Sequence, residues 1–515
     1  MSNYILLNTF IIFSYIYLLY KSKHAYHMLQ LESYKNERYI KWVKNNKTIK
    51  IKELILIIPN IILFFNFRLG LIINIIWLLV LILFRNKYTE KKPLVVTARI
   101  KRMYVAEILI LILIGGLANL YNMTVIISSI LIIFSYIFIL LINIINSPIE
   151  KSIQLKYYNK AKRKLKSNQN LKVIGITGSY GKTSTKYIVG TILSQKYNTL
   201  ITPESYNTTM GVVRTINEKL DNTHQVFVCE MGAKNIGDIK EICDLVEPKY
   251  GILTAIGPQH LETFKTLENV KNTKMELVES LPIEGKSFVN FEDENIKEIK
   301  FNKNNIKFGL NSNCDYYATD IEINEFGANF NIHMKGNEII NVKTKLLGVH
   351  NIVNIVGAVA ICDELGLSKE EIIAGIRFLK PVTHRLELKR NPNGSIIIDD
   401  AYNSNVKGAK MALDVLANFK NKKRILITPG IVDLGEKAEE YNKNLGKQAA
   451  GSCDYIILVG EKQAKPILEG ILEEEYNKEE VYVAKDITEA INKMNEMMDS
   501  NTVVLFENDL PDNYL

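Results

Sequence analysis

The chain is poor in cysteine, and its cysteines lack the spacings that build metal ribbons or disulfide scaffolds. Five cysteines occur in 515 residues, and no two of them form a C-x-x-C pair. Zinc ribbons and a disulfide framework are therefore not expected, and a reducing compartment such as the cytosol fits. The segment after residue 380 also lacks a G-x-G-x-x-G fingerprint, which argues against a redox dinucleotide.

Charged residues are scarce through much of residues 1–150, where isoleucine, leucine and phenylalanine dominate. A membrane span needs about 20 apolar residues, with a range of about 17–25. Apolar runs cover 4–20, 54–84, 108–123 and 124–146, and no acidic or histidine residue lies within them. An ion or proton pathway deep in a span is therefore not expected. The net charge of +9 comes largely from basic residues before position 167, which favours a lipid bilayer over nucleic acid as the partner.

The basic residues between the apolar runs predict how the chain crosses a membrane. Lysines and arginines gather in 21–53, in 85–106 and in 156–166. Short loops rich in these residues stay cytoplasmic, and all three can do so only if 54–84 crosses twice, turning near Arg68. The pattern thus predicts five spans, an outside N-terminus and a cytoplasmic C-terminal half. No small-residue cleavage site follows the first run, which disfavours a signal peptide.

A glycine-rich stretch, GITGSYGKTSTK, follows the buried strand predicted for 171–177 and opens a helix predicted for 183–195. The common phosphate loop would place a glycine at position 176, where this chain has Ile176. The strand–turn–helix setting nevertheless indicates an anion site, because backbone N–H groups at a helix N-terminus point at a bound phosphate. Lys182 can reach the terminal phosphates, and Thr183 can offer its hydroxyl to Mg²⁺.

The spacing G-x-x-G-K-T, preceded by Ile-Thr, resembles the ATP loop of the Mur ligases, which add amino acids to the stem peptide of peptidoglycan. Further segments resemble motifs of that family: VFVCEMGAKNIGDI (226–239), GILTAIGPQHLETFKTLENVKNTKMELVESLP (251–282), LGVHNIVNIVGAVA (347–360) and HRLE…IIIDDAYNSN (384–405). The Glu-Met-Gly-Ala and Asp-Asp-x-Tyr-Asn-x-Asn forms are similar to the branch that adds D-alanyl-D-alanine, the MurF type. The resemblance covers about residues 171–510.

The resemblance implies a fold and a reaction. It implies an α/β P-loop ATPase-like central domain and an α/β Rossmann-like C-terminal domain, which follow the α-helical transmembrane region of about five spans predicted from the apolar runs in a multi-domain chain. The implied reaction uses ATP and Mg²⁺ to activate a carboxylate as an acyl phosphate, which an amine then attacks. Alternating strands and helices, predicted from residue 395 onward, fit a parallel sheet with helices on both faces.

The same resemblance implies roles for particular residues. One Mg²⁺ would be shared by Thr183 and Glu230. A second would lie between His260 and Lys274, a lysine that is often carbamylated in the family. The implied catalytic set is Lys182, Lys274, His260 and Arg385, and the implied nucleotide contacts are Gly178, Gly181, Lys182, Thr183, Ser184, Asn351, Asn354, Arg385, Asp400 and Asn403. Ordinary explanations remain open, since Asn351 can cap a helix, His260 can be structural and Lys274 can belong to a solvated charged face.

The chain departs from soluble family members on both sides of this core. Those members begin with a uridine-nucleotide-binding domain, whereas only the basic segment 151–170 lies between the last predicted span and the ATP loop. The carboxylate substrate is therefore expected at the membrane, as a nucleotide- or lipid-linked muramoyl peptide. Toward the incoming amine, Thr428-Pro429 stands in place of Gly-Asp-Met and Asn442 in place of a histidine, and the chain stops at FENDLPDNYL where the branch usually continues Lys-Gly-Ser-Arg.

The sequence leaves alternative functions open. The first is a multi-pass membrane ligase of cell-wall synthesis, with cytoplasmic catalytic domains, that joins a muramoyl peptide to a D-amino acid or dipeptide. The second is a related ligase for another polymer such as poly-γ-glutamate, and the third is a transporter or scaffold with a regulatory nucleotide domain. Whether the membrane region only anchors the enzyme or also handles substrate stays open. The predicted boundaries are 1–150 for the transmembrane region, 151–170 for a basic linker, 171–380 for the central domain and 381–515 for the C-terminal domain.

Overall fold

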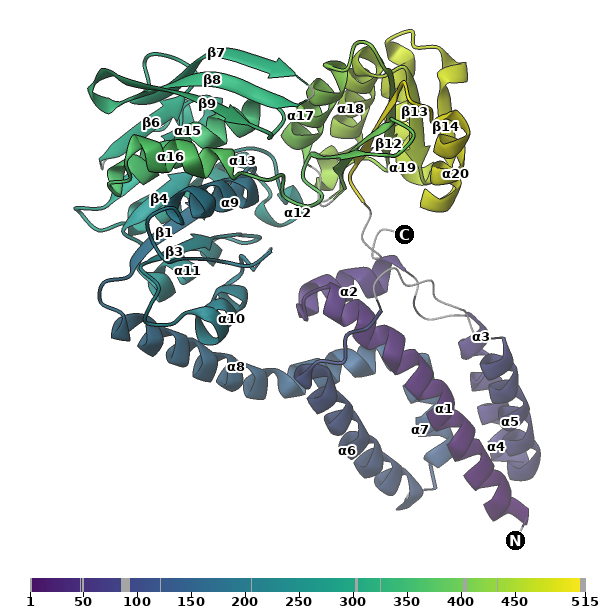
Figure 1. The fold of residues 1–515 in the computed structure, drawn as a ribbon. Coiled ribbons are helices and arrows are strands. Elements are labelled where there is room, and N and C mark those ends of the chain that lie inside the picture. Colours follow the sequence, from purple (N-terminus) through teal and green to yellow (C-terminus); the bar gives the residue numbers. More distant parts are fainter. Residues whose placement is uncertain are drawn as a thin grey trace. The chain divides into compact units, whose positions relative to one another are not determined.

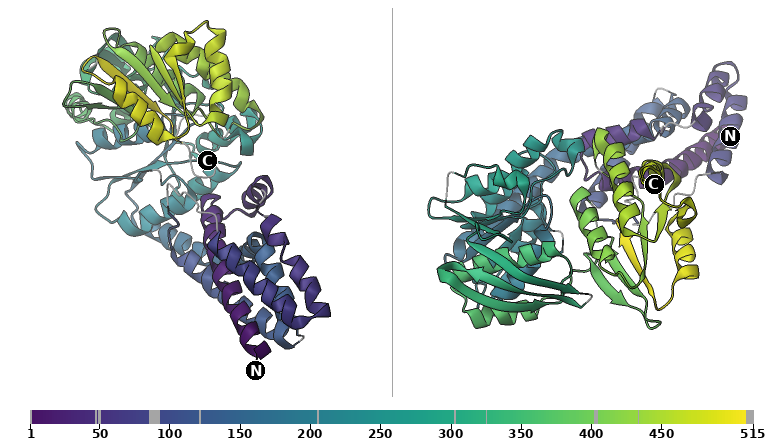
Figure 2. Two further views of the ribbon diagram at one scale, coloured as in Figure 1. Left: turned by 90° about the vertical axis from the view of Figure 1, so that its right-hand side faces the viewer. Right: turned by 90° about the horizontal axis from the view of Figure 1, so that it is seen from above.

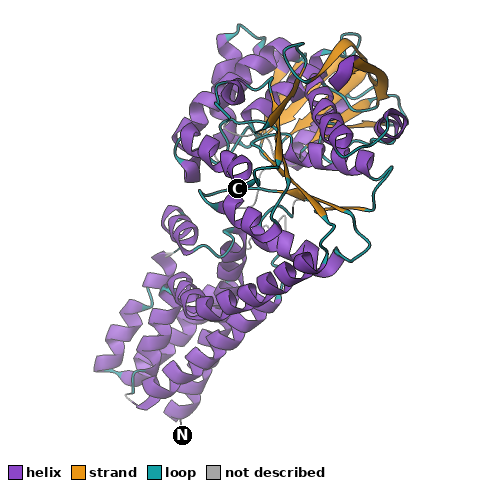
Figure 3. Cartoon of the chain, turned by 90° about the vertical axis from the view of Figure 1, so that its left-hand side faces the viewer, coloured by secondary structure: helices purple, strands orange, loops and turns teal. Residues whose placement is uncertain are grey.

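The computed structural model in Figure 1 describes residues 2–46, 48, 51–84, 93–120, 122–204, 206–301, 304–324, 326–401, 405–432 and 434–509. The chain forms two compact units, Met1–Leu155 and Lys156–Leu510. The described part of the first unit is helical, and the second contains two separate β-sheets with their own helices, as the colours of Figure 3 show.

Long apolar helices build the first unit. Three of them are long and apolar enough to cross a bilayer: Asn3–Leu31, Ala98–Leu120 and Ser135–Ser167. Since α5 and α7 are apolar but shorter, the described residues show three candidate spans where the sequence predicts five. The helices are α1 (Ser2–Leu31), α2 (Asn36–Asn45), α3 (Ile51–Leu54), α4 (Ile57–Phe65), α5 (Phe67–Leu83), α6 (Ala98–Leu120), α7 (Thr124–Ile133) and α8 (Ser135–Ser167), the last of which continues into the second unit.

The apolar run 54–84 is broken in its middle. Asn66 follows α4, and its side chain caps α5 by accepting a hydrogen bond from the backbone N–H of Leu69 at 3.0 Å. α4 and α5 lie close together, because a Cβ added at Gly70 would come within 2.7 Å of the backbone nitrogen of Leu63. The break therefore lies where the basic pattern places a turn, near Arg68.

The helices also bury charges that the apolar runs do not reveal. α6 begins at Ala98, well before the run that starts at position 108, so Glu107 lies inside the helix and is fully buried. Its carboxylate accepts hydrogen bonds from the hydroxyls of Ser22 at 2.5 Å and Tyr26 at 2.9 Å, both on α1. The expectation that no acidic side chain lies deep in a span is therefore wrong for this candidate span. Paired polar groups let the helix extend beyond its apolar core.

A second buried pair connects three helices of this unit. Lys21 Nζ on α1 lies 2.7 Å from Glu53 Oε2 on α3, and the two side chains are 3% and 2% exposed. The hydroxyl of Tyr17 donates to the same carboxylate at 2.9 Å, and Lys21 also donates to the backbone oxygen of Ile132 on α7 at 3.1 Å. Each charge is thus neutralised and hydrogen-bonded, as burial requires.

A nine-stranded sheet forms the centre of the second unit's first domain (Figure 2). Its order is β2-β3-β1-β4-β5-β6-β7-β8-β9, parallel from β2 to β7 and antiparallel from β7 to β9. The strand predicted at 171–177 is present, whereas the antiparallel extension is an addition that the motifs do not mark. The strands are β1 (Lys172–Thr177), β2 (Thr199–Ile201), β3 (Val226–Glu230), β4 (Tyr250–Leu253), β5 (Lys286–Asn290), β6 (Asn305–Gly309), β7 (Tyr316–Asn324), β8 (Gly327–Met334) and β9 (Glu338–Thr344).

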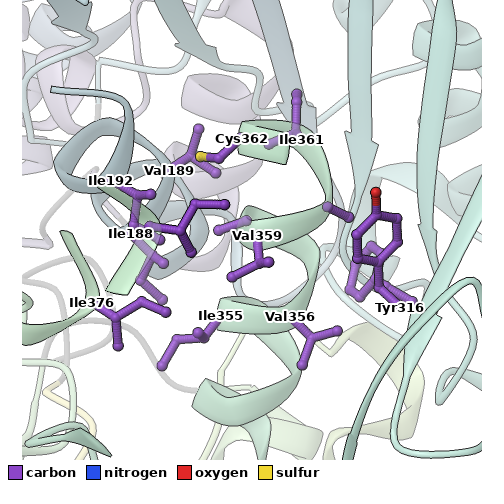
Figure 4. Packing of buried hydrophobic residues seen from close by; sticks show 14 of the residues in the cluster. Ile188, Val189, Ile192, Tyr316, Ile355, Val356, Val359, Ile361, Cys362 and Ile376 are labelled. Atoms are coloured by element: carbon purple, nitrogen blue, oxygen red, sulfur yellow. The ribbon is translucent and has the colours of Figure 1, made fainter. Parts of the chain in front are cut away.

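Helices cover both faces of this sheet. α9, α15 and α16 pack on one face, where Figure 4 shows Ile188 and Ile192 of α9 beside Ile355 and Val359 of α15. α10, α11 and α13 pack on the other face. The helices of this domain are α9 (Lys182–Leu193), α10 (Thr209–Lys219), α11 (Asp238–Val246), α12 (Leu261–Phe264), α13 (Leu267–Ser280), α14 (Glu294–Lys297), α15 (Val349–Glu364) and α16 (Lys369–Arg377).

The basic segment 151–170 is not a free linker. Most of it belongs to the end of α8, where Ala161 is fully buried in the core shared with α10 and α11. Lys162 Nζ donates to the backbone oxygen of Asp244 at 3.1 Å, and Asn217 donates to the backbone oxygen of Tyr157 at 3.0 Å. This end of α8 is therefore part of the second unit.

A six-stranded sheet of order β10-β11-β15-β12-β13-β14 forms the C-terminal domain. It is parallel except for the edge strand β10, which the sequence reading omitted. The alternation of strand and helix predicted from residue 395 onward is confirmed, with helices on both faces. The elements are β10 (Glu387–Arg390), β11 (Ile396–Asp400), α17 (Val406–Ala417), β12 (Lys423–Thr428), α18 (Ala438–Ser452), β13 (Tyr455–Val459), α19 (Glu461–Glu473), β14 (Val481–Ala484), α20 (Ile487–Met497) and β15 (Thr502–Glu507).

The Lys21–Glu53 pair gives a stability test of the helical unit. We expect Glu53→Ala to destabilise the protein by about 3–5 kcal/mol, because it leaves Lys21 buried without its counter-charge. The double variant Lys21→Met/Glu53→Leu removes both charges and should recover most of that loss. Thermal unfolding of the detergent-solubilised chain measures both; a single variant as stable as the wild type would contradict this role of the pair.

Candidate active site

The phosphate loop lies between β1 and α9 and is hydrogen-bonded to the segment that follows β4. Ser179 donates its backbone N–H to the backbone oxygen of Ala255 at 2.7 Å, and its hydroxyl donates to the backbone oxygen of Gly257 at 3.0 Å. A Cβ added at Gly178 would lie 2.1 Å from Thr254 Oγ1, so no side chain fits there. Gly181 precedes α9 with a φ of 78°, a conformation that glycine adopts without strain.

Ile176 explains why the common phosphate-loop motif, which has a glycine at this position, is absent. Its side chain is fully buried in the core, and in the sheet it pairs with Glu230 of β3. The chain therefore leaves the strand only after Thr177, and the loop is correspondingly tight. This register also places Glu230, the last residue of β3, directly beside the loop.

The carboxylate of Glu230 is the best-connected group of the site. Its Oε1 accepts hydrogen bonds from the Thr183 hydroxyl at 3.1 Å and from the Asn207 amide at 2.9 Å. Its Oε2 lies 3.0 Å from Lys186 Nζ, and the two side chains are 2% and 0% exposed. Burial lowers the pKa of Lys186, and the charge of Glu230 opposes that shift. The structure thus brings together Thr183 and Glu230, as the resemblance implies, and adds Asn207 and Lys186.

Lys182 places its positive charge at the phosphate loop. Its Nζ donates to the backbone oxygens of Gly178 at 2.6 Å and Ser179 at 3.2 Å, so the amine is enclosed although the residue is partly exposed. Burial lowers the pKa of Lys182 to about 8; the charge of Glu230 opposes this shift, and that of Arg385 adds to it. Arg385 of the C-terminal domain is therefore close enough for its charge to act on the loop.

Lys274 is a buried amine that forms no ion pair with a described residue. It lies on α13 and is 1% exposed, and the structure shows no hydrogen bond to its amine from any described residue. Burial lowers the pKa of Lys274 well below its usual value, and the nearby Lys182 lowers it further. Asp238 and Glu276 oppose the shift, but both are occupied by backbone N–H groups, of Asn235 and Lys240 among others. A solvated charged face, the ordinary explanation for this lysine, is therefore excluded.

His260 comes from the same edge of the sheet as the loop. It lies beyond the carboxyl end of β4, the strand that pairs with β1, and it precedes α12 with a φ of 52°. Ligands of open α/β folds bind at this edge. Its side chain is partly exposed.

The two asparagines of α15 have different surroundings. Asn354 faces the loop, because a Cβ added at Gly181 would lie 3.2 Å from Asn354 Oδ1. Asn351 instead donates its amide to the backbone oxygen of Leu347 at 2.8 Å, at the start of its own helix. Asn351 therefore does not cap α15, whose N-cap is Gly348, and its contact with the nucleotide stays a prediction.

The C-terminal motif HRLE is held against strand β11. Asp399 accepts hydrogen bonds from His384 at 2.8 Å and Lys389 at 2.6 Å, and Asp400 accepts one from the backbone N–H of Leu386 at 3.1 Å. Burial raises the pKa of Asp400, against the charge of Arg385. Asn403 lies outside the described residues.

The segment after β12, where the sequence departs from the family, is fixed by asparagines. Asn442 accepts a hydrogen bond from the backbone N–H of Ile431 at 2.8 Å and donates to the backbone oxygens of Ile431 and Ala438, both at 2.9 Å. Asn508 donates to the backbone oxygen of Gly430 at 2.6 Å. Asn442 therefore shapes this segment through the backbone rather than presenting a titratable side chain.

Sequence reasoning missed Lys186, Asn207 and a contact between the domains. Lys407 of α17 lies 3.1 Å from Asp293, whose side chain is 2% exposed. Lys186 stands inside the quoted loop motif, four residues past Lys182, and that helical spacing was the available signal. Asn207 and Asp293 carry no comparable signal, because only the fold brings them to their partners.

Comparison with known families agrees with this site. Residues 176–362 match the Mur ligase middle domain, and residues 384–507 match the Mur ligase, glutamate ligase domain. The chain therefore belongs to the Mur ligases through its middle and C-terminal domains. Members of this family are ATP-dependent ligases that form an amide bond.

Within that family, the chain is similar to UDP-N-acetylmuramoyl-tripeptide--D-alanyl-D-alanine ligases. That of Escherichia coli (strain K12) is 31% identical over 296 residues, covering 56% of this chain and 65% of the relative. That of Bacillus subtilis (strain 168) is 29% identical over 276 residues, covering 53% and 59%. The chain thus spans less than two thirds of the length of these relatives.

Solved structures of the same branch share the fold. MurF from Acinetobacter baumannii superposes with a TM-score of 0.63 at 28% identity, covering 69% of this chain and 77% of that one. The MurF ligase of Thermotoga maritima, solved in complex with ADP, superposes with a TM-score of 0.62 at 25% identity, covering 69% and 80%.

The partly exposed His350, which precedes Asn351 on α15, predicts acid sensitivity. Burial lowers the pKa of His350 from 6.5 to about 4. The unfolded chain takes up this proton below about pH 6.5 and the folded chain only below about pH 4, so stability should fall between these values as the pH drops. We expect His350→Asn to lose less stability over that interval than the wild type. Unfolding midpoints measured against pH test this, and parallel curves for the two proteins would contradict it.

Proposed function

We propose that this chain is an ATP-dependent ligase of peptidoglycan precursor synthesis that joins a muramoyl tripeptide to D-alanyl-D-alanine or a similar amine. The observation that carries the proposal is the junction of the phosphate loop with Glu230, which accepts a hydrogen bond from Thr183 at 3.1 Å. The match over both family domains and the activity named for its relatives support the same reaction.

The reaction proceeds in two steps. The γ-phosphoryl group of ATP passes to the substrate carboxylate, giving an acyl phosphate and ADP; the amine then attacks the acyl carbon, loses a proton, and phosphate leaves. Backbone N–H groups at the start of α9 and the Lys182 ammonium bind the phosphates, because both present positive charge to the loop. Arg385 adds positive charge from the C-terminal domain.

The side chains around the loop fit a magnesium site. Thr183 and Glu230 offer the oxygen ligands that Mg²⁺ prefers, and His260 and a carbamate on Lys274 would hold a second ion. Bound Mg²⁺ neutralises the charge that builds up as the phosphoryl group moves.

Lys274 is suited to carbamylation because its environment favours the neutral amine. That amine attacks carbon dioxide, a nitrogen–carbon bond forms and a proton is released, which leaves a carbamate. The buried neutral amine is thereby replaced by an anion that can ligate a metal. The burial of this amine and the nearby charge of Lys182 support this step.

The remaining nucleotide contacts follow from their places around the loop. Gly178, Gly181 and Ser184 lie in the loop and the first turn of α9, and Asn354 faces Gly181. Asp400, the last residue of β11, and Asn403, three positions later in the sequence, would bind the ribose and adenine. A C-terminal domain closed over the site would shield the acyl phosphate from water.

Substitutions at two lysines test the proposed chemistry. We expect Lys182→Ala to abolish ligation and Lys274→Ala to do the same, with partial rescue of the second variant by a short-chain carboxylate that replaces the carbamate. The matched control is Lys271→Ala on the same helix, which loses only a surface pair with Glu268 at 4.0 Å and should retain activity. If Lys274→Ala ligated at the wild-type rate, the reaction would not need a carbamate on Lys274, which would contradict that part of the proposal.

The substrates are tested by phosphate release with purified full-length protein. Release from ATP that requires both a muramoyl tripeptide and D-alanyl-D-alanine is expected, because the amine completes turnover. Release with glutamate alone would instead indicate a poly-γ-glutamate ligase. No release with any carboxylate and amine pair would favour a regulatory nucleotide domain and contradict the proposal.

We further propose that the first unit is a multi-pass membrane domain, with the catalytic domains in the cytoplasm and the N-terminus outside. Three helices are long and apolar enough to cross, and α6 exposes large apolar side chains such as Ile112 (66%) and Leu113 (62%). Such side chains suit contact with lipid. The basic clusters that flank the helices support this orientation; the count of five crossings further requires α4–α5 to be a hairpin.

A pocket in this unit suits a lipid-linked form of the substrate. Its volume is about 400 Å³, and it lies among α1, α6 and α7, from Leu111 to Asn119 on α6. At 1.5 Å per residue, this part of α6 is about 20–32 Å from its start at Ala98. An acyl chain in the cytoplasmic leaflet reaches about half of a hydrocarbon core roughly 30 Å thick. A substrate held at the cytoplasmic face of the membrane would therefore need a long polyprenyl chain to reach the pocket.

Photo-crosslinking tests the lipid-linked substrate. We expect a polyprenyl-linked muramoyl peptide to label the wild-type protein more strongly than its uridine-nucleotide form. Gly116→Leu should weaken that labelling, because an added Cβ at this pocket residue meets nothing within 4 Å and a longer side chain would fill the space. Equal labelling by both forms would contradict the lipid-linked version while leaving the ligase reaction in place.

A further inference from the structure

Lys186 stands against the same carboxylate that would bind the metal. It lies one helical turn after Lys182, is fully buried, and places its Nζ 3.0 Å from Glu230 Oε2. The ammonium also donates to the backbone oxygen of Glu204 at 2.5 Å and lies 4.6 Å from the centre of the Tyr187 ring. These contacts fix the charge at one side of Glu230.

Glu230 can take a further ligand only at Oε2. An ionised carboxylate can accept about four hydrogen bonds, two at each oxygen. Thr183 and Asn207 use both positions at Oε1, whereas Oε2 is buried, accepts no hydrogen bond from a described residue and lies 3.0 Å from the Lys186 ammonium. Oε2 could therefore ligate an ion, but the negative charge that would attract a divalent ion is already balanced by Lys186.

We propose that Lys186 is a positioning residue that keeps Glu230 from binding a divalent cation on its own, so that the metal enters together with the nucleotide. A free ion meets a neutral pair and the repulsion of a buried ammonium close by. A nucleotide brings several negative charges and phosphate oxygens to the same place, which outweigh that repulsion. The inference rests on the proposed role of Glu230 as a metal ligand and adds the order in which metal and nucleotide bind.

The test measures Mn²⁺ binding to the purified full-length protein by electron paramagnetic resonance, without substrates and therefore independently of activity. The wild type should bind Mn²⁺ weakly alone and at least about tenfold more tightly with a non-hydrolysable ATP analogue, a typical size for such coupling. Lys186→Met should bind Mn²⁺ at least about tenfold more tightly than the wild type without nucleotide. The gain in Mn²⁺ affinity on adding the ATP analogue should therefore be smaller for Lys186→Met than for the wild type.

Control variants identify the site and separate charge from structure. Lys186→Met/Glu230→Gln should lose the gained Mn²⁺ binding, which shows that Glu230 is the ligand. Lys186→Arg keeps the charge and should behave as the wild type, as should Lys196→Met at an exposed position after the same helix. If the methionine variant does not fold, Lys186→Gln removes the same charge.

Each result decides the proposal. Wild-type protein that binds Mn²⁺ equally well with and without nucleotide overturns it, whatever the variants do. The proposal is also overturned if Lys186→Met or Lys186→Gln binds Mn²⁺ no more tightly than the wild type. Lys186 would then have only a structural role, through its hydrogen bond to Glu204. Failure of the proposed ligase reaction is separate, because it appears only in the phosphate-release assay.

Discussion

The carboxylate of Glu230 is the point at which the parts of the middle domain meet. It ends β3 beside the phosphate loop and takes hydrogen bonds from Thr183 of that loop and from Asn207 just before α10. Lys186 of α9 adds a buried positive charge. Because an unpaired buried charge commonly costs about 3–5 kcal/mol, the carboxylate stabilises the fold as well as forming the site.

Positive charge lies close together at the phosphate loop. The charge of Arg385 acts on the enclosed Lys182, and the charge of Lys182 in turn acts on the buried Lys274. Such an arrangement is unfavourable by itself and becomes favourable when an anion of several charges is bound. The same electrostatics therefore explains the nucleotide site, the proposed carbamate on Lys274 and the proposed entry of metal with the nucleotide.

Much of this fold is predictable from the sequence because local signals repeat. The buried strand before the loop, the helix after it and the strand–helix alternation of the C-terminal domain have clear apolar patterns, and the structure follows them. Glu230 was found because it ends such a strand. Asn207 was not found, because its partner Glu230 lies on a separate element, strand β3. The strands β7–β9 pair with their sequence neighbours and were not found because they lie outside the recognised motifs. Glu107 was missed because its hydroxyl partners lie on another helix, outside any apolar run.

The proposed reaction depends on an acyl phosphate made from a muramoyl carboxylate. The direct measurement supplies the full-length protein with ATP, D-alanyl-D-alanine and a muramoyl tripeptide whose reacting carboxylate carries oxygen-18, and examines the released phosphate by mass spectrometry. We expect each phosphate released during ligation to carry one oxygen-18 atom, because one carboxylate oxygen leaves with the phosphoryl group. Phosphate that contains no oxygen-18 while the amide product forms would contradict it.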